Sequence, residues 1–303
     1  MEPNEVKEGG EAGGVPEAVQ VCGQQFRQVI KHRLGSLPTL PEVVSNIMAI
    51  VRDEHSNSLQ LAGYIEGDQA ICSAVLRVAN SAYYGNYRKV DSIGRAVVVL
   101  GFDQVRSIAL STSVFDRLGR GGSHHFDRRQ FWLHCIGVAT AARLISERRG
   151  HADEFYFMCG LLHDIGKLVF DEHLPRDYAH VIGRAASERR PLIELERERF
   201  GLDHAEAGQL ILERWKLPAN IISGLRHHHA WEGSGSVPEA ALVVALADNV
   251  CQEAGIGAGG APKAGLEYLL GLKLGFSATQ MKELSQELAA RRDRIEGFLK
   301  ALE

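Results

Sequence analysis

The sequence predicts an all-α protein made of two helical subdomains. Apolar residues recur at helical spacing through most of the chain, as at Val43, Val44, Ile47 and Ile50. Extended alternation of apolar and polar residues, which is typical of half-buried strands, is absent from the sequence. Residues that favour helix caps stand before several of these apolar patterns, and glycines separate others. The sequence therefore indicates a helical fold throughout.

The first predicted subdomain covers residues 17–118 and contains short helices. We expect these helices at 41–51, 58–65, 69–79, 93–100 and 104–115. Asp68 is placed to cap the third of them, because its carboxylate can accept hydrogen bonds from the free N–H groups of the first turn. Gly101 separates the last two. Residues 1–16 are rich in Glu and Gly, offer little apolar surface to bury, and are predicted to form a disordered leader.

The second predicted subdomain covers residues 119–303 and begins with a Gly-rich linker at 119–123. Longer helices are expected at 129–148, 154–170, 203–215, 218–227, 239–254 and 277–302. The second of these is apolar on several sides, which predicts a central position in the bundle. Asp203 and Glu206 fit a capping box that opens the third.

Composition and charge exclude several classes of protein. Of the 303 residues, 45% are hydrophobic and the formal net charge is -4, so a globular core is expected and no nucleic-acid partner is indicated. No apolar run approaches the ~20 residues that span a bilayer. The N-terminus lacks the basic and apolar regions of a signal peptide, so we predict a cytoplasmic protein without membrane contact. The five cysteines form no C-x-x-C pair and are interpreted as free buried thiols.

A histidine and an aspartate, His163 and Asp164, interrupt the apolar run 158–170. A buried, unpaired carboxylate costs several kcal/mol, about 3–5 by the usual estimate, so something must compensate its charge. A divalent metal ion would do so, since His and Asp supply the nitrogen and oxygen ligands that transition metals accept. Further candidate ligands stand on other predicted helices: His134, His204, His227, His228 and Asp248.

Each candidate also has a simpler interpretation. A single buried histidine is more often a hydrogen-bonded core residue than a metal ligand. Asp248 could pair with an arginine, and the run of three histidines at 227–229 could be a solvated helix end. Only the set as a whole points to a metal site assembled from facing helices.

Four stretches carry a resemblance to a known family. They are GLLHDIGKLVF at 160–170, LPTLPEVV at 37–44, IEGDQAICSAVLRVANSAYYG at 65–85, and SIGRAVVVLGFDQVRSIAL at 92–110. The first looks like the signature of the HD superfamily of metal-dependent phosphohydrolases. The others resemble the HDOD module, the HD-related output domain of bacterial signalling, although Gln69 stands where that family usually has proline. The resemblance covers about residues 30–300 and implies an HD-superfamily helical bundle in the second half.

The second half is also similar to the HD-GYP branch, whose members hydrolyse cyclic di-GMP at a site with two or three metal ions. That resemblance implies metal ligands at His134, His163, Asp164, His204, His227, His228 and Asp248. It implies that Asp164 bridges the ions and that Lys167 faces the substrate phosphate. The run 227–239 resembles a worn HHExxDGxGYP segment in which His229, Glu232 and Ser236-Val237 replace Glu, Asp and Tyr-Pro. Gln130 stands where members with larger clusters carry Glu.

These observations lead to two hypotheses. The first is a bacterial signalling module with protein partners, one or two bound transition-metal ions, and weak or no catalysis. The second is a metal-dependent phosphohydrolase acting on a nucleotide or cyclic dinucleotide, in which a metal-bound water attacks phosphorus and Asp164 and Lys167 are catalytic. The resemblance favours iron, and the ligand types also suit Mn, Zn or Ni.

Overall fold

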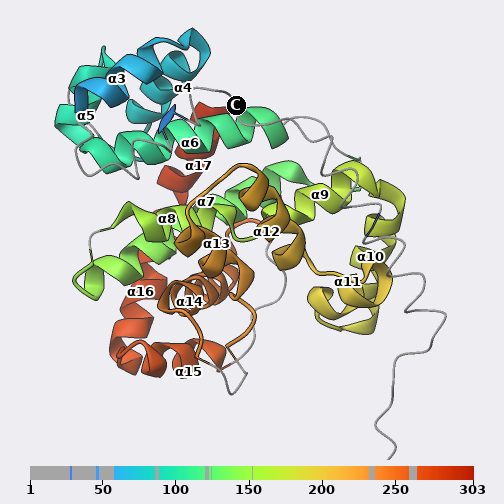
Figure 1. The fold of residues 1–303 in the computed structure, drawn as a ribbon. Helices are drawn as coiled ribbons and strands as arrows, with labels where there is room; N and C mark the ends of the chain where they lie inside the picture. Colours follow the sequence, from blue (N-terminus) through green and yellow to red (C-terminus); the bar gives the residue numbers. More distant parts are fainter. Residues whose placement is uncertain are drawn as a thin grey trace, which may run out of the picture.

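The computed structural model describes residues 58–85, 89–119, 123, 125–151, 153–231, 236–258 and 265–303, together with residues 28, 46 and 47. Within these residues every regular element is a helix and no strand occurs, which confirms the all-α prediction (Figure 1). The predicted leader at 1–16 and most of the predicted helix at 41–51 lie outside the described residues. The boundary at 119–123 stays a prediction, since the structure describes only Gly119 and Ser123 of that stretch.

Four helices of the first half pack together at one end of the molecule (Figure 1). They are α3 (Ser58–Glu66), α4 (Gln69–Ala79), α5 (Ile93–Leu100) and α6 (Phe102–Leu118). The Asp68 carboxylate caps α4 as predicted, accepting hydrogen bonds from the backbone N–H groups of Ala70 and Ile71 at 3.0 and 3.1 Å. Gly101 separates α5 from α6 with a φ of 95°, a conformation that favours glycine.

The second half is organised around one long helix, α7 (Arg128–Arg148), which is buried along almost its whole length. Helices α8 (Glu154–Leu162), α14 (Glu239–Glu253), α16 (Ala278–Ala290) and α17 (Arg292–Leu302) pack against it. Helix α8 approaches α7 closely because Gly160 has no side chain; a Cβ there would lie 2.7 Å from the Cα of Ala139. Among the described residues, no helix is long and apolar enough to cross a membrane.

The single helix predicted at 154–170 is wrong in one respect, because the chain breaks at His163 and Asp164 into α8 and α9 (Ile165–His173). Asp164 leaves helical geometry with φ −104° and ψ 7°. The new direction brings Gly166 against α12 (His204–Arg214), where a Cβ would lie 1.9 Å from the carbonyl oxygen of His204. The helix predicted at 277–302 is likewise two helices, α16 and α17, which meet at Arg291.

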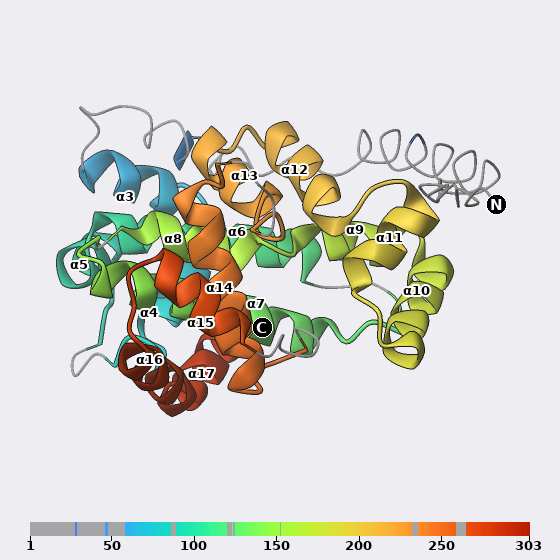
Figure 2. The ribbon, with the colours of Figure 1, turned by 90° about the horizontal axis from the view of Figure 1, so that it is seen from below.

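Three helices were not predicted: α10 (Pro175–Glu188), α11 (Leu192–Phe200) and α15 (Leu266–Lys273). Helices α10 and α11 form a hairpin at the end of the molecule opposite α3 and α5 (Figure 2). The C-terminal helix α17 returns to the first half and packs on α4, where the Arg77 side chain donates a hydrogen bond to the carbonyl of Ala301 at 3.2 Å. Helices α12, α13 (Ala219–Arg226) and α14 close the second half around the break at Asp164.

Candidate metal centre

The Asp164 carboxylate lies at the centre of a buried group of histidines. Three of them reach it from different helices: His163 Nε2 lies 3.2 Å from Oδ2, and His204 Nε2 and His228 Nε2 lie 3.3 and 4.0 Å from Oδ1. His134 Nε2, from α7, lies 3.9 Å from Oδ2 and 3.1 Å from Oδ1 of Asp248. The helix break lies at this meeting point: the chain leaves helical geometry at Asp164, and α9 then packs against α12.

The rings of three histidines are held so that Nε2 faces Asp164. His163 Nδ1 lies 2.7 Å from the carbonyl of Gly160, and His228 Nδ1 lies 2.5 Å from the carbonyl of Leu225. His204 Nδ1 lies 2.6 Å from a carboxylate oxygen of Glu196. Because each of these neighbours can only accept, Nδ1 carries a proton, and in the neutral ring Nε2 is then the nitrogen with the lone pair. That is the orientation of histidines that bind a metal through Nε2.

Several nitrogens at the centre are buried without a hydrogen-bond partner. Among the described residues, these include Nε2 of His134, His163 and His228, whose side chains are at most 1% exposed. Buried polar atoms almost always have partners, so a cluster of such nitrogens, two of them 3.1 and 3.2 Å from carboxylate oxygens, needs an explanation. A divalent cation fits, because it would satisfy the lone pairs and the carboxylate charge together.

The candidate ligands form three overlapping groups whose donor atoms lie within 4.8 Å of one another. The groups are His134, His163 and Asp248; His163, Asp164 and His228; and His204, His228 and His229. Asp164 is therefore flanked by a group that contains a carboxylate and a group of three histidines. These donors are numerous enough to bind one ion or two.

Burial and charge set the protonation of these groups. Burial alone would raise the pKa of Asp164, but His163, Lys167 and His204 outweigh it and hold the pKa well below its usual range. Burial, together with His163 and His204, lowers the pKa of His228 to about 3. Burial with His228 and His204 also lowers the pKa of His229 well below its usual range. The carboxylate is thus ionised and these two imidazoles are neutral, which is the state that binds metal ions.

The structure differs from the sequence interpretation at the histidine run. His227 belongs to none of the three groups, and its Nδ1 lies 3.0 Å from the carbonyl of Ser223, one turn back along α13. His229 does belong to one of these groups, and its Nε2 lies 2.9 Å from that of His204. The helix ends at Arg226, so the backbone turns and the facing pair becomes His228 and His229. Moving the motif register by one residue also aligns Pro238 with the proline of HHExxDGxGYP.

Glu196 was not identified from the sequence. Its side chain is fully buried, and its carboxylate accepts hydrogen bonds from both the ring and the backbone N–H of His204. The hydroxyl of Tyr178, on α10, donates to the other carboxylate oxygen at 3.2 Å. Burial lowers the pKa of His204, but Glu196 more than offsets it, and the pKa is raised. Glu196 therefore orients His204 as an outer partner of the centre.

Lys167 lies beside the carboxylate at the more exposed edge of the centre. Its Nζ is 2.5 Å from Oδ2 of Asp164, one turn along α9. The side chains of Lys167 and Asp248 are 12% and 16% exposed, whereas the histidines around Asp164 are almost fully enclosed. Gln130 stands on α7 one turn before His134, where it brings an amide in place of a carboxylate.

Comparison with known proteins agrees with this architecture. The HDOD domain family matches residues 37–231, almost two thirds of the chain. The chain belongs to the HDOD family. This HDOD protein resembles the crystal structure of an HDOD domain protein of unknown function from Geobacter sulfurreducens, with 26% identity, a TM-score of 0.77, and coverage of 92% of this chain and 99% of that one.

Two further relatives extend the comparison. A signal transduction protein from Marinobacter aquaeolei shares the fold at 22% identity and a TM-score of 0.78, over 95% of this HDOD chain and 67% of its own. An uncharacterized protein of Treponema pallidum is 25% identical over 221 residues, which is 71% of this chain. The match spans only 42% of that curated relative's length.

Proposed function

We propose that this HDOD protein is a regulatory module that binds one or two divalent transition-metal ions around Asp164. The observation that carries the proposal is the cluster of orphan imidazole nitrogens facing one buried carboxylate. Without a cation, these atoms would forgo hydrogen bonds that water supplies in the unfolded chain. The ligands would be those of the three groups above, with Asp164 between two ions if both are present.

The chemistry of the donors favours a transition metal over Mg²⁺ or Ca²⁺, because most of the donors are imidazoles. We favour iron, with Mn, Zn and Ni as the other ions that suit this set. A bound ion of this kind would lower the pKa of a coordinated water.

A regulatory role with weak or no catalysis is supported by the replacement of motif residues that accompany catalysis in the HD-GYP branch. The Asp and Tyr of the HHExxDGxGYP segment are replaced in either register, and Gln130 offers a neutral amide where larger clusters have Glu. The Marinobacter aquaeolei protein, which shares the fold, is named a signal transduction protein. The role proposed here is therefore to relay a signal to a partner in the cytoplasm of a bacterium.

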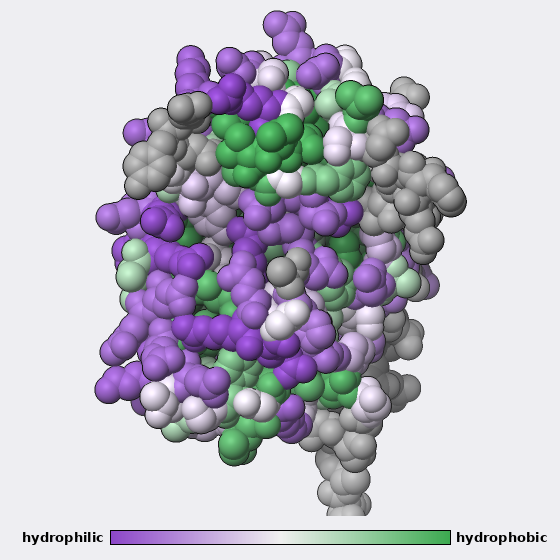
Figure 3. Space-filling view, turned by 90° about the vertical axis from the view of Figure 1, so that its left-hand side faces the viewer, coloured by the Kyte–Doolittle hydropathy of each residue, from purple (hydrophilic) through white to green (hydrophobic). Residues whose placement is uncertain are grey.

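A protein partner is supported by apolar side chains on the surface of the first half. Leu59 on α3 and Val98 on α5 are 83% and 85% exposed, and Val99 is half exposed. Figure 3 shows apolar residues gathered over this end of the molecule above a broad polar band. Contiguous apolar patches of this kind mark interaction surfaces more often than isolated residues do.

The metal proposal is tested by elemental analysis of the purified protein. We expect about one to two equivalents of transition metal per chain, by the ligand count of such sites. His163→Ala should lose most of it. His180→Ala, which removes an exposed histidine on α10, should keep it. Equal metal content in both variants, or no affinity of the wild type for Fe, Mn or Zn, would refute the site.

Phosphohydrolysis is the second candidate function. The position of Lys167 favours it, because an ammonium beside Asp164 at the exposed edge could offset charge on an approaching phosphate. Two proteins of Shewanella amazonensis that share the fold are named phosphohydrolases. The test is to incubate the protein, loaded with Mn, Fe or Zn, with cyclic di-GMP, other cyclic nucleotides and nucleoside phosphates. Turnover that is lost in Lys167→Met but leaves metal content unchanged would favour the enzyme over the regulatory module.

A further inference from the structure

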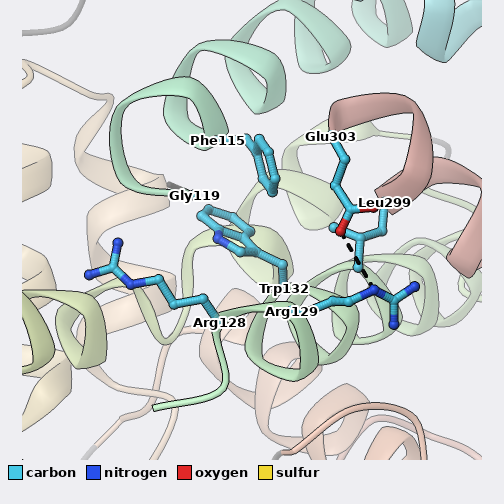
Figure 4. Close-up of a pocket in the computed structure, with 7 residues that line it drawn as sticks. All are labelled: Phe115, Gly119, Arg128, Arg129, Trp132, Leu299 and Glu303. Atoms are coloured by element: carbon cyan, nitrogen blue, oxygen red, sulfur yellow. Dashed lines mark ion pairs between the residues drawn. The ribbon is translucent and has the colours of Figure 1, made fainter. Parts of the chain in front are cut away.

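A small cavity lies where α6, α7 and α17 meet (Figure 4). Its volume is about 250 Å³. Its walls include Phe115 from α6, Arg128, Arg129 and Trp132 from α7, Leu299 from α17, and Glu303, which follows α17. The cavity is therefore lined by helices from the first half of the chain and from its C-terminal end. A cavity of this size accepts a single ring system rather than a drug-sized ligand.

The indole of Trp132 is the unusual group in this cavity. Its side chain is 1% exposed, and its N–H has no hydrogen-bond partner among the described residues. Figure 4 shows the ring in the middle of the lining side chains, with Arg128 on one side and Leu299 and Glu303 on the other. Buried indole donors usually find a partner, so an unpaired one that borders a cavity points to an acceptor carried by a ligand.

The two arginines of the cavity differ in how firmly they are held. The guanidinium of Arg128 donates to the carbonyl of Leu118 at 2.7 Å and to Asp171 at 2.9 Å, so it forms a fixed wall. Arg129 is loosely held: its Nε lies 3.5 Å from a carboxylate oxygen of Glu303, and its side chain is 52% exposed. An exposed ion pair of this length contributes little, so the Arg129 guanidinium is free to turn toward an anion.

Aromatic side chains supply a surface for a flat molecule. The rings of Phe115 and Trp132 have centroids 5.4 Å apart and are tilted by 59°. Leu299 adds an apolar wall from α17. A planar ring would pack against these groups, while the hydrogen-bond donors of the cavity would select for acceptors on that ring.

We propose that this cavity binds a small planar aromatic anion, with its ring against Trp132 and Phe115 and its carboxylate or phosphate at Arg129. The indole N–H would donate to an acceptor of the same molecule. The site is separate from the metal centre, because Trp132 and His134 are two residues apart on α7 and so face different sides of that helix. Occupancy of the cavity therefore does not require metal.

The test uses the three tryptophans of the chain, whose indole N–H groups give separate signals in a ¹H–¹⁵N correlation spectrum. The signal of Trp132 is assigned by its loss in Trp132→Phe. Indole-3-carboxylate and phenyl phosphate are then titrated into the full chain. We expect at least one of them to shift the Trp132 signal saturably, with a dissociation constant below about 1 mM, while the signals of Trp215 and Trp231 stay in place.

Two controls isolate the anion contact. Arg129→Gln should weaken binding roughly fivefold, the size of one partly exposed charge contact, whereas Arg190→Gln on the α10–α11 hairpin should not change it. Neutral indole-3-carboxamide should bind as weakly to the wild type as the carboxylate does to Arg129→Gln. If only one probe binds, its anionic group, a carboxylate or a phosphate, is the one that the cavity prefers. The proposal is overturned if neither probe shifts the Trp132 signal, if all three signals move together, or if Arg129→Gln binds as tightly as the wild type.

Discussion

Helix α7 contributes to two buried polar clusters that differ in how their charges are satisfied. In the first, the Arg143 guanidinium donates to the Glu154 carboxylate at 2.5 Å and to the hydroxyl of Tyr83 at 3.1 Å. It also lies 4.2 Å from the centroid of the Phe157 ring. In the second, nine residues earlier along α7, His134 and its neighbours surround Asp164 with imidazole nitrogens that have no hydrogen-bond partners among the described residues.

We call the Arg143 group the closed cluster, because its charges are paired within it, and the Asp164 group the open cluster. Arg143 and Glu154 neutralise each other, and Tyr83 ties this pair to the first half of the chain. In the Asp164 cluster, the Lys167 ammonium pairs with the carboxylate from one side, while Nε2 of His134, His163 and His228 has no hydrogen-bond partner among the described residues. The buried ion pair compensates its own charges, although Nε of Arg143 has no hydrogen-bond partner among the described residues. A buried carboxylate surrounded by unpartnered imidazole nitrogens favours a cation instead.

The largest expected effect comes from opening the closed cluster. Glu154→Gln removes the carboxylate that pairs with the buried Arg143, and breaking such a pair costs about 3–5 kcal/mol. Urea denaturation should show this loss in the free energy of unfolding, while metal content per folded chain stays at the wild-type value. The double change Arg143→Met and Glu154→Leu should recover much of the stability. A loss below about 1 kcal/mol in the single variant would mean that water reaches this pair.

Removing metal should affect stability somewhat less. A ligand at one hundred times its dissociation constant stabilises the folded state by about 2.7 kcal/mol. Chelation should therefore lower the thermal midpoint by about 5 °C, a shift that added Mn, Fe or Zn reverses. Asp164→Asn, which lacks the central charge, should be insensitive to both treatments. If chelator shifts the wild type and Asp164→Asn equally, the metal binds elsewhere.

The group of three histidines provides a narrower test of the open cluster. His229→Ala removes one donor from the group that also contains His204 and His228. We expect the affinity for one ion to fall roughly fiftyfold, about 2.3 kcal/mol, as measured by competition with a chromogenic chelator. His227→Ala is the matched control on the adjacent residue and should stay within about twofold. If His227→Ala loses affinity and His229→Ala does not, the ligand pair is His227 and His228, as the sequence analysis predicted.

Local signals in the sequence predicted much of the fold. Gly101 ends α5 as expected, and Asp68 and Asp203 cap their helices through the predicted hydrogen bonds. The break at Asp164 was missed because the apolar pattern continues on both sides of His163 and Asp164. Only the tertiary contact of Gly166 with α12 requires the chain to turn there. Helical periodicity reports which face is buried but does not report contacts between distant segments.

The candidate site shows the same limit. His134 Nε2 and Asp248 Oδ1 lie 3.1 Å apart although the two residues are 114 positions apart in the sequence. Only a family resemblance could suggest that these residues meet. Pro238 also favours moving the register of the histidine run by one residue, a choice that the His229→Ala test decides. Glu196 also left a signal: it lies four residues after Leu192 and four before Phe200, on the apolar face of an otherwise charged helix. A lone carboxylate on a buried face indicates a buried partner.

Glu196 therefore provides the last and smallest test of the open cluster. Glu196→Gln keeps an oxygen that can accept from His204 Nδ1 but removes the charge, so we expect metal affinity to fall about tenfold, or about 1.4 kcal/mol. Glu194→Gln, an exposed position on the same helix, should bind metal like the wild type. Because Glu196 also accepts from the backbone N–H of His204, stability is measured on the metal-free variants in parallel. A loss of stability without a loss of affinity would make Glu196 a helix-terminus contact of α12 and not an outer partner of the metal.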